Sequence, residues 1–474
     1  MQKTRLTSFL ASLNRNEMKT FGEFISSPVF NKNNQLIKLY EIYSRFYPDP
    51  GDHSLTNKEV FEFVFGKIEF EYFKLKNLES DLLALGKEFL AFLKFRQDEK
   101  RRDTDLLAEL RKRGLKQIFE STFKLSEKKL NSETVRDEKW LLHRMNLSDE
   151  EVYFSVPFKP EVQLNRLQEK MNNTADYSIM ILLRNYNLIL HDQQQFNLTF
   201  DLKLFEQIMG YVRDIGGHTN PTIQLLYLMV MLNIERNDES FRNLYDHRKK
   251  HRDEISSIDN YYAFLLLDGY CAYCYNNFSR TDLLREQFDL TRECDINLFP
   301  ELGKVLYPDF VYSVKIAARV GEFEYAEDYI ERFKKNLTGE KENTINFCRA
   351  IILCGREKHD DALELLARVN FSDFILKIQV KLLILQTLIN KADYEQARLT
   401  IDSFRHYLSR EQLLISEHKA VMLEFLKITM EMIGLATSAI PSQASKQVLE
   451  LQVRNLEKNF LGIKLWLKSK LEKM

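Results

Sequence analysis

The chain has 474 residues, and its 44% hydrophobic share is enough to build a sizeable buried core. Glycine (15) and proline (9) are scarce, which favours helices joined by short polar turns over sheets joined by tight turns. Lys and Arg (68) almost cancel Asp and Glu (69), so the net charge of −1 creates no general field that would attract nucleic acid or an anionic membrane.

The cellular compartment is predicted from the start of the chain and from its cysteines. The first residues lack the basic-then-apolar order of a signal peptide, and no uncharged apolar run reaches the length of a membrane span. The odd number of cysteines suits buried thiols in a reducing compartment better than a disulfide framework. They are Cys271, Cys274, Cys294, Cys348 and Cys354. We therefore predict a cytoplasmic protein without a membrane partner.

The first 97 residues are predicted to be a helical module. Asn14 is expected to cap a helix over 18–25, which Ser27 and Pro28 end. Further helices are expected over 36–43 and over 69–95, and between them a short helix that Thr56 caps and Gly66 ends.

Residues 98–163 are predicted to connect this module to the rest of the chain. The charged stretch 97–104 indicates a boundary, and helices are expected over 105–118, 124–130 and 133–145. Residues 146–162, which include Pro157 and Pro160, are expected to form a loop.

From about residue 164, helical patterns alternate with short polar links that favour antiparallel neighbours. Helices are expected over 177–191, 201–212, 222–234, 239–251, 259–275 and 280–293.

A repeat is the strongest pattern in the sequence. Ala326, Ala362 and Ala397 follow one another at intervals of 36 and 35 residues, and a fixed period in this range is typical of stacked helix pairs. Phe323, His359 and Tyr394 stand three residues before these anchors, and Ile330, Leu366 and Ile401 stand four residues after. A small anchor lets two helices cross closely, and the bulky residues one turn later point at the next pair.

The segments Gly321-Glu-Phe-Glu-Tyr-Ala326, Lys358-His-Asp-Asp-Ala362 and Ala392-Asp-Tyr-Glu-Gln-Ala397 resemble the turn of the tetratricopeptide repeat. The resemblance is clear for about residues 306–408. It implies an all-α, right-handed α-solenoid over 164–408, followed by capping helices over 409–474. It also implies a groove for a protein or peptide segment. The groove residues that it suggests are Lys315, Arg319, Thr344, Phe347, Gln379, Gln386 and Asn390.

The N-terminal module has two interpretations. The segments Ser27-Pro-Val-Phe-Asn-Lys32, Val64-Phe-Gly66 and Lys74-Leu-Lys-Asn-Leu-Glu-Ser-Asp-Leu82 resemble an uncharacterised helical family of Bacteroidota-like bacteria, which carries no assigned activity. Alternatively, a degenerate helix-turn-helix would make the chain a tetratricopeptide-type transcription regulator, with Lys74, Lys76, Asn77 and Ser80 as DNA contacts. Glu79 and Asp81 in the same turns would repel phosphates, so nucleic acid is not the expected partner.

No recognised reaction centre is present in the sequence. Phosphate-binding loops, nucleophile elbows and zinc-protease motifs are missing. Cys271 and Cys274 form a single Cys-x-x-Cys within an apolar helix, and His247 and His251 lack a third metal ligand of known position. We therefore predict a non-catalytic scaffold without cofactor or metal.

Overall fold

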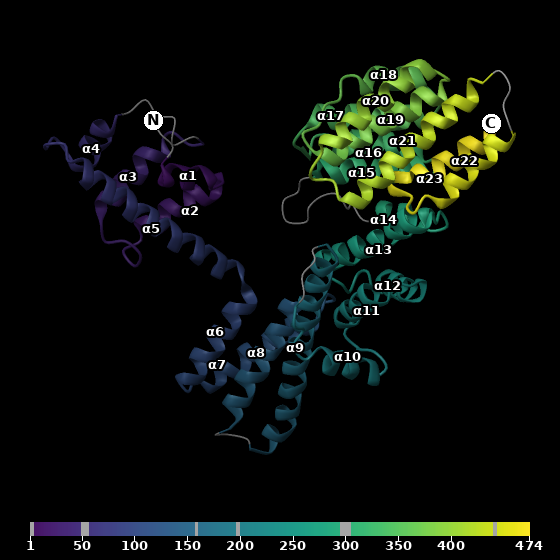
Figure 1. Cartoon of the computed structure of the whole chain (residues 1–474). Helices are drawn as coiled ribbons and strands as arrows, with labels where there is room; N and C mark the ends of the chain where they lie inside the picture. The colour runs from purple at the N-terminus through teal and green to yellow at the C-terminus, as the bar shows by residue number, and fades with distance from the viewer. Residues whose placement is uncertain (1–3, 49–55, 157–159, 196–199, 294–304, 439–442) are drawn as a thin grey trace. The chain divides into compact units, whose positions relative to one another are not determined.

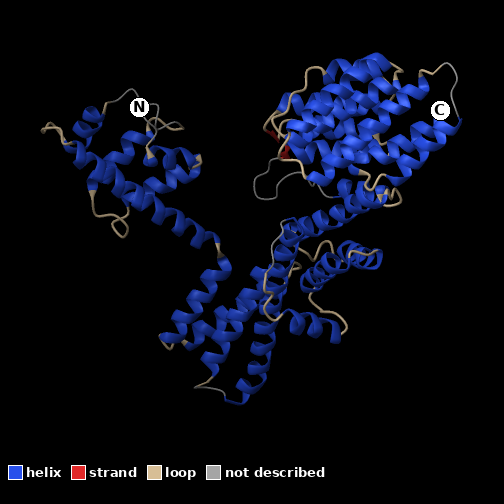
Figure 2. Cartoon of the chain, viewed as in Figure 1, coloured by secondary structure: helices blue, strands red, loops and turns tan. Residues whose placement is uncertain are grey.

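The computed structural model describes residues 4–48, 56–156, 160–195, 200–293, 305–438 and 443–474. These residues form 23 α-helices, one short 3-10 helix and two strands of two residues each (Figures 1 and 2). The strands, β1 (Val305–Leu306) and β2 (Leu337–Thr338), pair in parallel and were not predicted. The predicted all-α class is confirmed.

The chain divides into two compact units. The first contains residues 1–133 and 141–174, and the second contains residues 134–140 and 175–474. The module boundaries predicted at residues 97, 163 and 408 are not tested by this division and stay predictions.

The first unit begins with five helices around an aromatic core that includes Phe21, Phe61 and Phe89. The helices are α1 (Arg5–Ser12), α2 (Arg15–Ser26), α3 (Asn34–Ser44), α4 (Asn57–Phe65) and α5 (Tyr72–Gln97). The caps behave as predicted, because Asn14 and Thr56 each accept hydrogen bonds from the first turn of the helix that follows.

The next helices depart from the sequence prediction. They are α6 (Glu99–Lys112), α7 (Lys116–Asn131) and α8 (Glu138–Ser155), followed by α9 (Pro160–Gln195). The helix expected over 105–118 is interrupted at Gly114, which has a φ of +67° that glycine adopts without strain. The loop expected over 146–162 is also wrong, because α8 continues to Ser155 and buries Leu147 and Val152.

Helix α9 includes the helix expected over 177–191, and its residues from 175 on belong to the second unit, where five helices follow it. They are α10 (Phe205–Asp214), α11 (Pro221–Glu235), α12 (Asp238–Lys250), α13 (Ser257–Phe278) and α14 (Leu284–Glu293). Helix α11 packs against α12 and α13, and α13 packs against α14.

The repeat region contains three consecutive helix pairs. They are α15 (Tyr307–Arg319) with α16 (Phe323–Phe333), α17 (Lys341–Gly355) with α18 (His359–Leu366), and α19 (Phe374–Asn390) with α20 (Tyr394–Arg410). The anchors Ala326, Ala362 and Ala397 are all fully buried. The first helices contact one another in sequence, α15 with α17 and α17 with α19.

The turn within each pair repeats at the level of the backbone. Five residues before each anchor the chain adopts a positive φ, at Gly321 (81°), Glu357 (60°) and Ala392 (60°). The next amide then donates to the carbonyl five residues earlier at 2.9 Å, from Glu322 to Ala317, from Lys358 to Leu353 and from Asp393 to Leu388. This bond pattern closes a helix with a left-handed residue, so the sequence period corresponds to one repeated turn.

The chain ends with α21 (Ser416–Ala436), α22 (Gln443–Asn455), the 3-10 helix η1 (Phe460–Gly462) and α23 (Ile463–Lys473). Ile463, Leu467 and Leu471 form one buried stripe of α23 in the core that α19 to α21 share. Just before η1, the Asn459 side chain donates to the carbonyl of Tyr275, 184 residues earlier, at 3.0 Å. The end of the chain is therefore tied to α13.

Candidate functional site

The predicted site residues occupy repeated positions on the first helices of the three pairs. Eleven residues before the anchors stand the predicted residues Lys315 and Gln386 and, in the second pair, Ile351; all three are partly exposed. Seven residues before the first and third anchors stand Arg319, which is partly exposed, and Asn390, which is exposed. We call these five residues the first-helix surface.

Two of the predicted residues lie elsewhere. Thr344 and Phe347 were expected to line the groove, but both are buried, and Phe347 packs edge-on against Phe371. Phe347 stands fifteen residues before its anchor, and the equivalent Val311 and Leu382 are also buried. The position of Phe347 therefore faces the core in every pair. Thr344 is buried as well, although Gln379 at the equivalent position of the third pair is partly exposed.

Lys315 and Gln379 are brought together by the packing of the helix pairs. The ammonium nitrogen of Lys315 on α15 donates to Oε1 of Gln379 on α19 at 2.7 Å, although the two residues are 64 positions apart. One turn later on α15, the Arg319 guanidinium carbon lies 4.3 Å from the ring centroid of Tyr275 on α13. Three of the seven predicted residues thus belong to one polar region.

The two cations of this region have no direct acidic partner. Within the described part of the chain, neither Lys315 nor Arg319 forms an ion pair. Burial, together with the positive charge of Arg319, lowers the pKa of Lys315 to about 7. A lysine that titrates near neutrality on a partly exposed surface is a feature more common at functional sites than elsewhere.

Next to these cations lies a network that the sequence prediction missed. The hydroxyl of Tyr312 and the amide nitrogen of Gln287 both donate to Oδ1 of Asp268, at 3.1 and 3.0 Å. Burial raises the pKa of Asp268 to about 6, although these bonds and Arg319 act in the opposite direction. The signal in the sequence was Asp268 itself, a carboxylate placed directly after the apolar run Leu265-Leu-Leu267.

The other chemical motifs of the sequence are engaged in structural contacts. Cys271 and Cys274 are buried on α13, and burial raises the pKa of both thiols. A ring nitrogen of His247 lies 2.9 Å from the carbonyl of Pro221, and one of His251 lies 2.8 Å from Glu254. No group of three or more His, Cys, Asp and Glu side chains in the described ranges is placed to hold a metal ion.

On the helix proposed for DNA contact, both lysines contact other side chains of the protein. On α5, the Lys76 ammonium lies 2.7 Å from Glu79, which is buried and accepts a hydrogen bond from Tyr43. Lys74 lies 5.0 Å from the ring centroid of Phe65. Asn77 and Ser80 are exposed.

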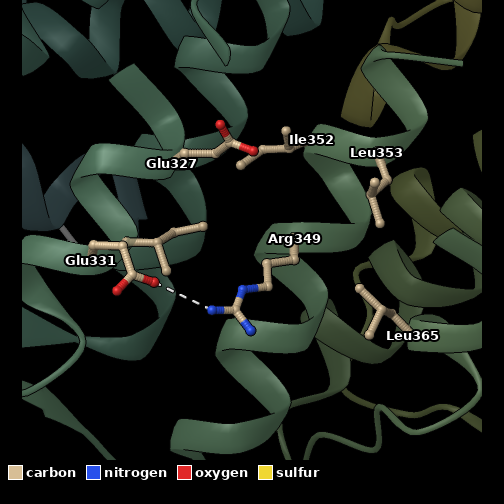
Figure 3. Close-up of a pocket in the computed structure, with 7 residues that line it drawn as sticks. Glu327, Glu331, Arg349, Ile352, Leu353 and Leu365 are labelled. Atoms are coloured by element: carbon tan, nitrogen blue, oxygen red, sulfur yellow. Dashed lines mark hydrogen bonds and ion pairs between the residues drawn. The ribbon is translucent and has the colours of Figure 1, made fainter. Parts of the chain in front are cut away.

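A surface depression of about 340 Å³ lies between α16, α17 and α18 (Figure 3). Glu327 and Glu331 of α16 face Arg349, Ile352 and Leu353 of α17 across it, and Leu365 of α18 completes the lining. The Arg349–Glu331 pair at 3.3 Å is half exposed on both sides, so it contributes little net energy. The charged groups of this depression are exposed and Arg349 already has an acidic partner, so the polar region at Lys315 is the better candidate for a binding site.

Comparison with protein-family models, with curated proteins and with solved structures found no match for this chain. Within the described ranges, no helix is both long enough and apolar enough to cross a bilayer.

Proposed function

We propose that this protein is a non-catalytic helical-repeat scaffold that binds a segment of a protein partner on its first-helix surface. In this proposal the three helix pairs are tetratricopeptide-like units of a right-handed solenoid. The repeated turn, the buried alanine anchors and the contacts between successive first helices support it.

The observation that carries the proposal is that neither Lys315 nor Arg319 forms an ion pair among the described residues, although Arg319 is near enough to the Asp268 carboxyl to lower its pKa. A cation that is partly removed from water is stabilised by an anion that reaches it, and the described residues provide no such anion by direct contact. The partner segment is therefore expected to be acidic. The carboxamides of Gln379 and Gln386, also partly exposed, can bond to its backbone.

The test is affinity capture from the cells that produce the protein, followed by a titration with the recovered partner. The bait is the full chain, either unchanged or as the double variant Lys315→Met, Arg319→Met. Hydrogen bonds to charged groups contribute about 1.5–3 kcal/mol each, so the loss of both is expected to raise the dissociation constant by at least about a hundredfold.

A matched control removes the same two charges elsewhere. Lys335 and Lys341 are exposed and form no ion pair in the described part of the chain, so Lys335→Met, Lys341→Met should retain the partner. Equal recovery with both double variants would reject the first-helix surface as the binding site. Failure to recover any protein partner would count against the scaffold function.

The alternative function, a transcription regulator that binds DNA through the N-terminal module, stays a prediction. The engagement of Lys76 with Glu79 gives it no support, so we do not develop it as a second proposal.

A further inference from the structure

A cavity lies apart from the first-helix surface, between the segment 366–371, α19 and α20. Its volume is about 460 Å³, within the range found for small-molecule pockets. Its apolar lining combines the buried Leu366, Phe371 and Val380 with the partly exposed Val369 and Ile384, and the exposed Ala367 and Asn370 also line it. A molecule from solvent can therefore reach part of the apolar lining.

Two lysines supply the positive charge of this cavity. Lys377 and Lys381 stand four residues apart on α19, so both lie on the same side of the helix. The ammonium nitrogen of Lys381 lies 5.4 Å from the ring centroid of Tyr407 on α20. All three side chains line the cavity and are partly exposed. Among the described residues, neither lysine forms an ion pair.

The two lysines differ in the acid that lies near them. Burial would raise the pKa of the Glu340 carboxyl, but its hydrogen bonds and the charge of Lys377 lower it. The charge of Lys377 is therefore partly compensated by Glu340. For Lys381, burial alone lowers the pKa. An ammonium that is partly removed from water without an anion is costly, so a ligand that brings a carboxylate to Lys381 offsets a cost that the free protein carries.

The acids on the Tyr407 side of the cavity are engaged elsewhere. Burial, together with the carboxylates of Glu411 and Asp373, raises the pKa of Tyr407 to about 12. Glu411 accepts from the Tyr407 hydroxyl at 3.2 Å and from a backbone amide at 2.9 Å, and Asp373 accepts from a backbone amide at 2.8 Å. In the described part of the chain, neither carboxylate forms an ion pair with Lys381. One cation thus stays uncompensated, and a singly charged anion matches it.

We infer that the cavity between the segment 366–371, α19 and α20 binds a small organic carboxylate with an apolar body. The carboxylate pairs with Lys381, and the apolar body contacts Val369, Ile384 and the ring of Tyr407. An acidic side chain of a protein partner is the competing occupant, and it carries no apolar body beyond its carboxylate.

This inference is independent of the proposed scaffold function. None of the residues that line the cavity belongs to the first-helix surface. Gln386 of that surface stands nine residues after Lys377 on α19, which at 3.6 residues per turn is a rotation of about 180°. The two sites therefore lie on opposite sides of this helix and can be tested separately.

The experiment measures the binding of 2-naphthoate to the full chain by equilibrium dialysis. One saturable site is expected. 2-Naphthalenemethanol has the same ring system without the charge, and acetate has the charge without the rings. Each should bind at least about tenfold more weakly than 2-naphthoate, because one lacks the ion pair and the other lacks the apolar contact.

Variants locate the site. Lys381→Met should weaken 2-naphthoate binding by about tenfold or more and leave 2-naphthalenemethanol unaffected, whereas Lys381→Arg keeps the charge and should retain most of the affinity. Lys377→Met should have a smaller effect, because Glu340 already compensates this lysine in part. The exposed Lys335, replaced in Lys335→Met, is the matched control and should bind 2-naphthoate as the unchanged chain does.

Four results would overturn the inference. They are the lack of saturable binding at millimolar 2-naphthoate, equal affinity for 2-naphthoate and 2-naphthalenemethanol, equal affinity for 2-naphthoate and acetate, and unchanged binding in Lys381→Met. Equal affinity for acetate would favour the acidic side chain of a partner. Loss of 2-naphthoate binding in the double variant Lys315→Met, Arg319→Met, with Lys381→Met unaffected, would place the bound anion at the first-helix surface and also reject this cavity.

Discussion

The replacement Asn459→Ala tests how the end of the chain is held to α13. Asn459 is fully buried, its amide nitrogen donates to the carbonyl of Tyr275 at 3.0 Å, and its oxygen accepts from the amide of Leu465 at 3.0 Å. Alanine removes both bonds and leaves both backbone partners in place. The bond between the backbone amide of residue 459 and the carbonyl of Asn276 is retained.

The cost follows from the burial of the two groups left behind. A buried carbonyl without a donor costs about 1–3 kcal/mol, and the partly buried Leu465 amide adds roughly 0.5–1.5 kcal/mol. The segment 456–473 should therefore open with about 2–4 kcal/mol less free energy than in the unchanged protein.

Hydrogen exchange measured by mass spectrometry reads this opening directly. Peptides that cover residues 456–473 should exchange about 30- to 1,000-fold faster in Asn459→Ala, while peptides from α15 to α18 should be unaffected. Asn390→Ala is the matched control, since Asn390 is exposed and makes no side-chain hydrogen bond in the described structure, and its effect should stay within about 0.5 kcal/mol. An acceleration of less than about threefold at 456–473 would refute the argument that these two bonds hold the segment.

Two further predictions concern the repeat pairs and their polar region. A β-carbon on Gly355 would lie 2.3 Å from the ring of Phe323, so Gly355→Ala should destabilise the chain by about 0.5–2 kcal/mol, because overpacking exceeds the gain in helix propensity. Gly434→Ala in α21 meets no atom within 4 Å and should stabilise by about 0.5–1 kcal/mol; urea unfolding of both variants checks the contrast, and equal shifts would contradict it. The pKa of Lys315 is about 7 in the folded protein, against an ordinary value of 10.5. The folded protein therefore loses stability as the pH falls from about 10.5 to 7, and the loss is complete below pH 7. Lys315→Met should therefore stabilise most below pH 7, with a gain that shrinks towards pH 10; a gain that does not change with pH would contradict the lowered pKa.

Local patterns in the sequence were sufficient for the helices and for the repeat. The 36- and 35-residue spacing of Ala326, Ala362 and Ala397 predicted three equivalent buried anchors, because helix pairs of equal length place small residues at equivalent crossings. Asn14 and Thr56 were recognised as caps because a cap acts within four residues of itself. Two helix boundaries were predicted wrongly. Gly114 ends a helix although the apolar pattern continues across it, and the chain stays helical to Ser155, where a loop had been expected from residue 146.

The candidate site depended on contacts that no local pattern encodes. The sequence located Lys315, Arg319 and Gln379 on first helices, but the bond between Lys315 and Gln379 joins residues 64 positions apart. The direction of each side chain was also undecided, and Phe347 faces the core because the neighbouring helix pair covers it. The bond from Asn459 to Tyr275 spans 184 residues and requires the stack of helices between them to bring the two ends together. Helix periodicity thus determined which residues are helical and which recur, while the angles at which the pairs stack decided which distant side chains meet.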